Sequence, residues 1–293
     1  MAVTSIITNN GAMIALQSLE MTQQQLAVTQ KAISTGYRVA DSTDDGAAYA
    51  IAQSVRSSVG ALTSANQQLG NVKGLLSTTQ TALNSASNTM NSMRDILVKL
   101  GDQNVQGVDR TNYISQYQSL VQQLQTAIQD ATYNGKSLLY SSAGAGVNKQ
   151  NISVVRNEMG STHTISSWNA MSLVYNHVNY GTAATGSLYT ASHALAVITP
   201  GSAGATSDSF LVAQKQIGTW LNKIGNEINY VDNQVTYNND KIDSLNSGLG
   251  ALVDADMAKE SAQLTALQIR QQLGTQALSL ANQAPQTLLS LFK

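Results

Sequence analysis

The residue types that most often carry chemistry are few in this chain, and their spacing does not fit a known site. Gly135-Lys136-Ser137 has the order that ends a phosphate-binding loop, but position 130 is Asp where that motif needs Gly, and the triplet follows a helical stretch instead of a strand. No His-Glu-x-x-His zinc motif occurs. The three histidines lie in one stretch with no metal-binding spacing, and we expect them to be solvated surface residues: His163, His177 and His193. We therefore expect no catalytic site, no metal and no cofactor.

Composition narrows the class of protein further. Only 11% of the 293 residues are charged, whereas about 25% is usual in globular domains. Sixteen Lys plus Arg against seventeen Asp plus Glu give a net charge of −1, which argues against a nucleic-acid partner. Cysteine is absent, and no apolar run is long enough for a membrane helix. We expect no membrane insertion and a surface on which like chains barely repel each other.

Apolar residues repeat every seven positions over long stretches, which is typical of helices packed along their length. The longest seam predicts one helix from about Asp44 to just before Gly101, and its members are Val55, Leu62, Leu69, Leu76, Leu83, Met90 and Leu97. A second helical segment, 113–131, stops at the turn pair Asn134-Gly135.

A third seam, from Phe210 to about Leu252, contains Ile224, Val231 and Leu245. Asn238 is the single polar residue at a seam position, and one buried Asn commonly fixes the register of packed helices. Gly248 and Gly250 weaken the helical pattern before a last amphipathic stretch, 257–280.

Both ends of the chain are amphipathic as well. The N-terminal seam consists of Leu19, Leu26 and Ile33, and the C-terminal seam contains Leu264, Leu267 and Leu278. Neither end has an evident partner helix within the chain. Because exposed apolar stripes of this length indicate association, we expect the ends to pack on each other and on copies of the same chain.

The character of the sequence changes between residues 141 and 208. Gly, Ser and Thr dominate, and short alternating runs such as 152–156 predict a small β-rich insert. Its aromatic residues leave a sugar-binding or adhesive role open: Trp168, Tyr175, Tyr180 and Tyr189.

These patterns predict a mainly α fold: a long antiparallel coiled-coil-like bundle with amphipathic terminal helices and a small β-rich central insert. The expected boundaries are 1–42 and 253–293 for the two terminal segments, 43–140 and 209–252 for the two parts of the long bundle, and 141–208 for the insert.

Several motifs at these positions resemble bacterial flagellin, the subunit of the flagellar filament. Near the N-terminus the resemblance rests on Ser34-Thr35-Gly36-Tyr37-Arg38-Val39 and Asp44-Asp45-Gly46-Ala47-Ala48. Further motifs are Tyr133-Asn134-Gly135-Lys136, Asp254-Ala255-Asp256-Met257 and Ala281-Asn282-Gln283-Ala284-Pro285.

The resemblance implies a structural subunit that polymerises through its terminal helices and transmits motor torque for swimming. It implies that 1–42 and 253–293 are the two halves of an inner helical domain, that 43–140 and 209–252 form an outer bundle, and that 141–208 is exposed at the surface. It also implies an extracellular filament, export by the flagellar type III apparatus without a cleaved signal peptide, and contacts with a chaperone, the filament cap and hook-filament junction proteins. Other subunits in the filament are copies of the same chain or other flagellins. The alternatives are a hook-filament junction protein, against which the tail 281–291 argues, and an adhesin on a coiled-coil stalk.

Particular residues acquire expected roles from the resemblance. Gly36, Gly248 and Gly250 lie where flagellins place connectors between their inner and outer shells, and we expect these connectors to hinge. Arg94, Asp95 and Val98 lie in the segment that an innate immune receptor recognises in many flagellins. Because Ser92 and Lys99 depart from the recognised pattern, we expect weak or no activation in a cell reporter assay.

Overall fold

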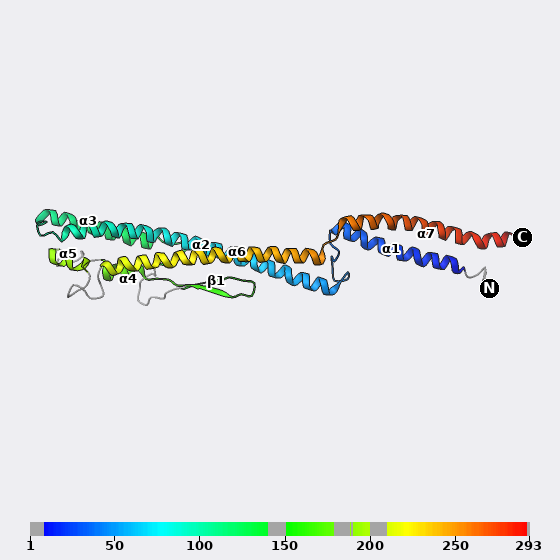
Figure 1. Cartoon of the computed structure of the whole chain (residues 1–293), viewed down its shortest axis with the longest axis horizontal. Coiled ribbons are helices and arrows are strands. Elements are labelled where there is room, and N and C mark those ends of the chain that lie inside the picture. The colour runs from blue at the N-terminus through cyan, green and yellow to red at the C-terminus, as the bar shows by residue number, and fades with distance from the viewer. Residues whose placement is uncertain (1–8, 140–150, 179–187, 189, 200–209, 292–293) are drawn as a thin grey trace. The chain divides into compact units, whose positions relative to one another are not determined.

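A computed structural model describes residues 9–139, 151–178, 188, 190–199 and 210–291, with the backbone alone from residue 284 on (Figure 1). Its elements are α1 (Asn10–Thr35), α2 (Gly46–Leu100), α3 (Gly107–Gln129), β1 (Ile152–Val155), β2 (Thr162–Ile165), α4 (Ala170–His177), α5 (Ala191–Ile198), α6 (Phe210–Val253) and α7 (Met257–Leu291). The predicted mainly α fold is confirmed. The chain divides into two compact units, one made of residues 1–59 and 242–293 and the other of residues 60–241.

In the unit of residues 60–241, α2, α3 and α6 run side by side (Figure 1). In the predicted α2 seam, the six residues from Leu62 to Leu97 are fully buried, and so are Ile224 and Val231 of α6. Val55, the first residue of the seam, falls in the other unit and is half-buried. Leu245 falls in the other unit and is half-buried. The heptad spacing therefore selected the buried face of each long helix correctly.

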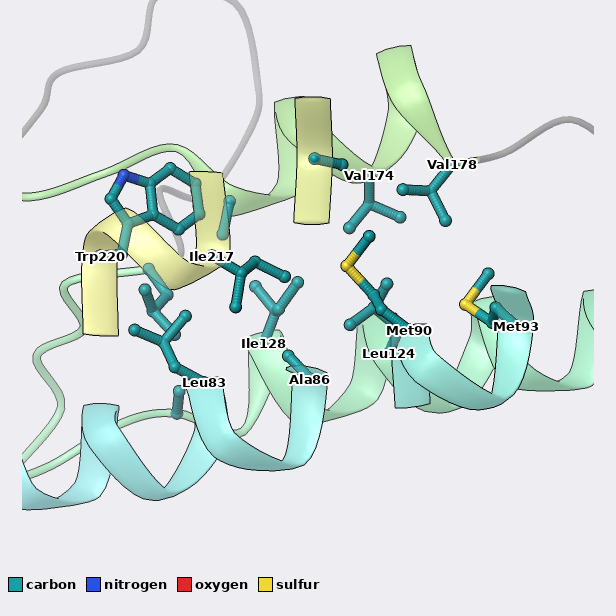
Figure 2. Close-up of a cluster of buried hydrophobic side chains, with 14 of the residues drawn as sticks. Leu83, Ala86, Met90, Met93, Leu124, Ile128, Val174, Val178, Ile217 and Trp220 are labelled. Atoms are coloured by element: carbon teal, nitrogen blue, oxygen red, sulfur yellow. The ribbon is translucent and has the colours of Figure 1, made fainter. Parts of the chain in front are cut away.

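The centre of this core joins residues from four parts of the chain (Figure 2). The side chains in this cluster come from α2 (Leu83, Ala86, Met90, Met93), α3 (Leu124, Ile128), α4 and its C-cap (Val174, Val178) and α6 (Ile217, Trp220). The insert thus contributes apolar side chains to the same core as the long helices.

The ends of the long helices follow from local chemistry. Asp45 Oδ1 accepts hydrogen bonds from the backbone nitrogens of Ala47 and Ala48 at 3.1 and 3.0 Å, so the carboxylate caps α2 close to the predicted start. After α3, Asn134 and Gly135 have φ values of 50° and 73°. This left-handed backbone suits Asn and Gly, and it confirms the predicted turn.

The insert contains a small antiparallel sheet in which Ile152 pairs with Ile165 and Val155 with Thr162. Two short helices, α4 and α5, accompany it, and the Ser- and Gly-rich composition did not predict them. Asn169 Oδ1 accepts from the backbone nitrogen of Ser172 at 2.9 Å and caps α4, whose Met171 and Val174 are buried. Packing against the bundle stabilises helices this short.

Helix α6 continues through Gly248 and Gly250 and ends only at Val253. The weakening expected at these glycines does not interrupt the helix. Within the described parts of the chain, no helix combines the length and apolar character that crossing a bilayer requires.

Candidate assembly surface

Helices α1 and α7 lie side by side in opposite directions (Figure 1). At one end of the pair, Asn9 Nδ2 donates to the backbone oxygen of Ala281 at 2.7 Å. At the other end, Tyr37 and Asp254 form an isolated antiparallel bridge. The expectation that the two ends pack on each other is therefore confirmed, while packing on copies of the same chain stays a prediction.

The seam between α1 and α7 is poor in large apolar side chains. On α1, a row of buried or half-buried positions repeats at spacings of three and four residues: Ala15, Leu19, Thr22, Leu26, Thr29 and Ile33. Ala32, beside this row, is buried as well. The matching positions of α7 are Leu264, Leu267, Gln271, Gly274, Leu278 and Ala281. All six predicted subunit-contact residues thus lie in the seam within one chain, where Thr, Gln, Gly and Ala alternate with them.

Glycine and threonine in the seam limit the apolar surface that the pair can bury. A Cβ atom at Gly274 would lie 3.3 Å from Leu19 Cδ1, so the two helices approach closely there. The Thr22 hydroxyl donates to the backbone oxygen of Ser18 at 2.8 Å and not to α7. Because apolar burial is the main force that pairs helices in water, this pair is weakly held on its own.

A second heptad on α1 faces away from this seam. Ile14, Met21 and Val28 are 68%, 53% and 61% exposed, and they lie about 140° around the helix from Leu19, Leu26 and Ile33. We call these three residues the α1 outer stripe. On α7, Leu273 and Leu280 are also seven residues apart and exposed.

The α1 outer stripe is not among the predicted contact residues, because the prediction used one apolar seam on each terminal helix. The signal was present as a second set of apolar residues at the same seven-residue spacing. Other large apolar residues exposed on the two helices are Met13, Leu16, Met257 and Ile269. An apolar surface of this extent on described residues is typical of a protein–protein contact.

The segments that leave α1 and α6 are hydrogen-bonded to each other. Gly36, at φ 75°, ends α1 in the left-handed conformation that favours glycine. Its backbone oxygen accepts from Ala255 N at 3.0 Å, while Arg38 N donates to Val253 O at 2.8 Å and Arg38 Nη2 to Leu252 O at 2.6 Å. These hydrogen bonds join two segments that are far apart in the sequence, 36–38 and 252–255, and we call this the joint.

A lysine fastens α1 to the segment that follows this joint. Lys31 Nζ lies 2.6 Å from Asp41 Oδ2 and 2.8 Å from Asp44 Oδ1. Asp44 Oδ2 also accepts from the backbone nitrogens of Ala40 and Asp41. The hydrogen bonds from Lys31 hold the pKa of the Asp41 and Asp44 carboxyls below their usual values, and they raise the pKa of Lys31.

Replacing Lys31 with Gln should raise the pKa of Asp41 toward its ordinary value of 3.8. A carboxylate whose pKa is lowered by folding stabilises the fold above its ordinary pKa and loses that effect as pH falls through the lowered value. A lysine whose pKa is raised stabilises below its ordinary pKa and loses the effect as pH rises through the raised value. The contact of Lys31 with the two carboxylates therefore stabilises the fold fully between about pH 4 and pH 10.

The measurement is an NMR titration of the Asp41 side-chain carbon. The control is the remote replacement Lys215→Gln, which should leave the Asp41 titration unchanged. An Asp41 midpoint that is the same in Lys31→Gln and in the unchanged chain would contradict the assignment.

His163 and His193 of the insert both make side-chain contacts, and of the two only His193 is exposed. His163 Nε2 lies 2.7 Å from Glu227 Oε2, and the imidazole stacks on Tyr230 with ring centroids 4.1 Å apart. The prediction of a solvated surface histidine is thus wrong for His163. His193 Nδ1 contacts the Thr190 hydroxyl at 2.6 Å. The described residues contain no group of three or more His, Cys, Asp or Glu side chains suited to a metal ion.

The aromatic residues of the insert give limited support to an adhesive surface. Trp168 is partly buried and stacks on Trp220 of α6, with ring centroids 5.9 Å apart. Tyr175 is exposed, whereas Tyr180 and Tyr189 lie outside the described residues. Trp168 thus serves the core of the protein.

The three residues of the expected receptor patch share an exposed face of α2. Arg94, Asp95 and Val98 are all exposed, while Met93 and Leu97 beside them are fully buried. Lys99 lies over the Tyr113 ring, with Nζ 5.5 Å from the centroid. The role of this patch stays a prediction.

Comparisons with known proteins agree with this architecture. Residues 6–143 match the bacterial flagellin N-terminal helical region, and residues 212–292 match the bacterial flagellin C-terminal helical region. The chain is 31% identical to flagellin FljK of Caulobacter vibrioides over 305 residues, which cover 100% of both chains. It is 31% identical to a flagellin of Brucella melitensis over 294 residues, which cover 99% of both.

A solved structure shares the fold. A structure described as a flagellar hook-associated protein of Vibrio parahaemolyticus superposes with a TM-score of 0.55 at 16% identity and covers 72% of this chain and 100% of that chain. The two matched helical regions and the relatives aligned over the whole chain show the family. The chain belongs to the bacterial flagellins.

Proposed function

We propose that this structural subunit of the extracellular flagellar filament polymerises through the outer faces of α1 and α7. The observation that supports this most is the α1 outer stripe, three apolar side chains at heptad spacing that the α1–α7 pair leaves exposed. In the filament, terminal helices of neighbouring copies would cover these residues.

The single chain covers one apolar face of α1 in the α1–α7 seam and leaves the α1 outer stripe exposed. The seam within one chain alternates leucines with Thr22, Thr29, Gln271 and Gly274. The α1 outer stripe alternates with Gln17 and Gln24, and its three large apolar side chains stay exposed in the single chain. Neighbouring copies therefore offer these helices apolar burial that the single chain cannot supply. Contacts between unlike faces of successive subunits extend into a helical polymer instead of closing into a ring.

Removing both terminal helices tests this proposal. The full chain, seeded with short filament fragments, is expected to form filaments visible by negative-stain electron microscopy. A chain of residues 41–254 is expected to form none at the same concentration. Filaments from the trimmed chain would refute assembly through α1 and α7, and a small closed oligomer from both chains would favour the adhesin or junction alternatives.

The finer expectations from the sequence belong to the same proposal. We propose that residues 1–42 and 253–293 form the inner part of the filament, that 43–140 and 209–252 form the outer bundle, and that 141–208 lie at the surface. Because Gly36 ends α1 within a hydrogen-bonded joint, a hinge there would move both connectors together. In contrast, Gly248 and Gly250 would act by bending a continuous helix.

We further propose export by the flagellar type III apparatus, with a chaperone, the filament cap and hook-filament junction proteins as partners. The role is mechanical and involves no substrate turnover. The receptor patch at Arg94, Asp95 and Val98 would be recognised weakly or not at all, because Ser92 and Lys99 alter its flanks.

A further inference from the structure

A row of polar side chains on α6 holds the β1–β2 hairpin. Glu227, Gln234, Asn238 and Lys241 share one face of α6, and each contacts the hairpin or its turn. Glu227 pairs with His163, and Lys241 pairs with Glu158. The backbone oxygen of Arg156 accepts from Gln234 Nε2 at 3.3 Å and from Asn238 Nδ2 at 3.0 Å. Because an isolated two-stranded hairpin is marginally stable in water, its order depends on contacts such as these.

Asn238 also contacts α2. Its Nδ2 atom donates at 2.8 Å to Asn66 Oδ1 and at 3.0 Å to the backbone oxygen of Arg156. Its Oδ1 atom accepts from Gln234 Nε2 at 3.0 Å. The Asn238 side chain is fully buried, so water cannot replace a partner that is lost.

We infer that the Asn238 carboxamide couples docking of the hairpin to the register of α2 against α6. The two hydrogens on Nδ2 diverge within the plane of the amide, and each goes to a different element. If α2 slid along α6 by one helical turn, about 5.4 Å, Asn66 would leave this position. The carboxamide would then rotate toward another acceptor, and its bond to the Arg156 oxygen would be lost.

This coupling makes docking of the hairpin depend on how α2 packs against α6, although the hairpin lies far from Asn66 in the sequence. The Asn66 side chain is hydrogen-bonded to Asn238 and Asn239 of α6, and through Asn238 it positions the group that binds the hairpin. The hairpin makes all of its contacts with α6 only when α2 and α6 pack in their native register. The inference concerns the folded single chain, so it holds or fails independently of filament assembly.

Hydrogen exchange on the full-length chain tests the coupling with a matched pair of variants. Asn66→Ala removes the α2 partner of Asn238 and touches no hairpin residue. Asn91→Ala removes a link of the same chemistry between the same two helices, since Gln214 Nε2 donates to Asn91 Oδ1 at 2.9 Å. Alanine favours helix at both sites, so neither change weakens α2 itself.

The backbone amides of 152–155 and 162–165 are expected to exchange about tenfold faster or more in Asn66→Ala. In Asn91→Ala they should exchange as in the unchanged chain. Asn66→Asp keeps the acceptor for Asn238 and loses only the donor to Asn239, so it should retain hairpin protection.

Two outcomes would overturn the inference. If hairpin exchange in Asn66→Ala equalled that of the unchanged chain, Asn238 would hold the hairpin without help from α2. If Asn91→Ala accelerated hairpin exchange as much as Asn66→Ala, the effect would come from general loosening of the bundle and not from the Asn238 carboxamide.

Discussion

Replacing Ile14, Met21 and Val28 together with Gln should abolish filament formation at concentrations where the unchanged chain polymerises. Covering the exposed parts of these three side chains contributes about 3–6 kcal/mol per subunit. The loss therefore raises the critical concentration for seeded growth about a hundredfold or more. Glutamine is a good helix former at exposed positions, so α1 should still pair with α7.

Sedimentation after seeding measures this critical concentration, and far-UV circular dichroism checks that the variant keeps its helices. A matched control replaces two exposed polar residues of the same helix that lie away from the α1 outer stripe, Gln23 and Gln30, with Ala. The control should polymerise nearly as the unchanged chain does. Normal filament growth by the outer-stripe variant would show that these residues are not subunit contacts.

Leu83→Ala is expected to cost about 2–5 kcal/mol in the free energy of unfolding of the bundle. Leu83 of α2 is fully buried in the core that α2 shares with α3 and α6 (Figure 2). Neighbouring side chains there cannot fully close the cavity that the substitution leaves. Val98→Ala provides the control, because Val98 lies on the same helix but is exposed. Its cost should stay within about 0.5 kcal/mol.

Urea unfolding followed by circular dichroism compares the two variants with the unchanged chain. Equal midpoints for Leu83→Ala and Val98→Ala would mean that the core around Leu83 is not packed as described. The prediction concerns stability alone, so it separates the fold of the bundle from the question of assembly.

The heptad pattern predicted the long helices well because burial along a helix repeats with its turn. Leu62 to Leu97 on α2 and Ile224 with Val231 on α6 are buried as expected. Asn238, singled out as the one polar residue of its seam, is fully buried and bonded to α2. A buried polar side chain stands out in sequence because it interrupts an otherwise apolar period.

Periodicity indicates which face of a helix is buried but not what covers it. The seam of Leu19, Leu26 and Ile33 was compatible with a partner in the same chain or in neighbouring copies, and the structure places it on the side of α1 that packs against α7. The joint between Gly36 and Ala255 rests on backbone hydrogen bonds between distant segments, which side-chain patterns do not encode. Helices α4 and α5 are eight residues each and owe their form to tertiary packing.

A photo-reactive amino acid in place of Met21 tests the central claim most directly, because Met21 lies in the middle of the α1 outer stripe. In assembled filaments, irradiation is predicted to join α1 of one copy to another copy, giving a covalent dimer that is absent from the unassembled protein. If filaments formed and irradiation joined α1 to nothing, or only to its own chain, the outer stripe would not be the assembly surface.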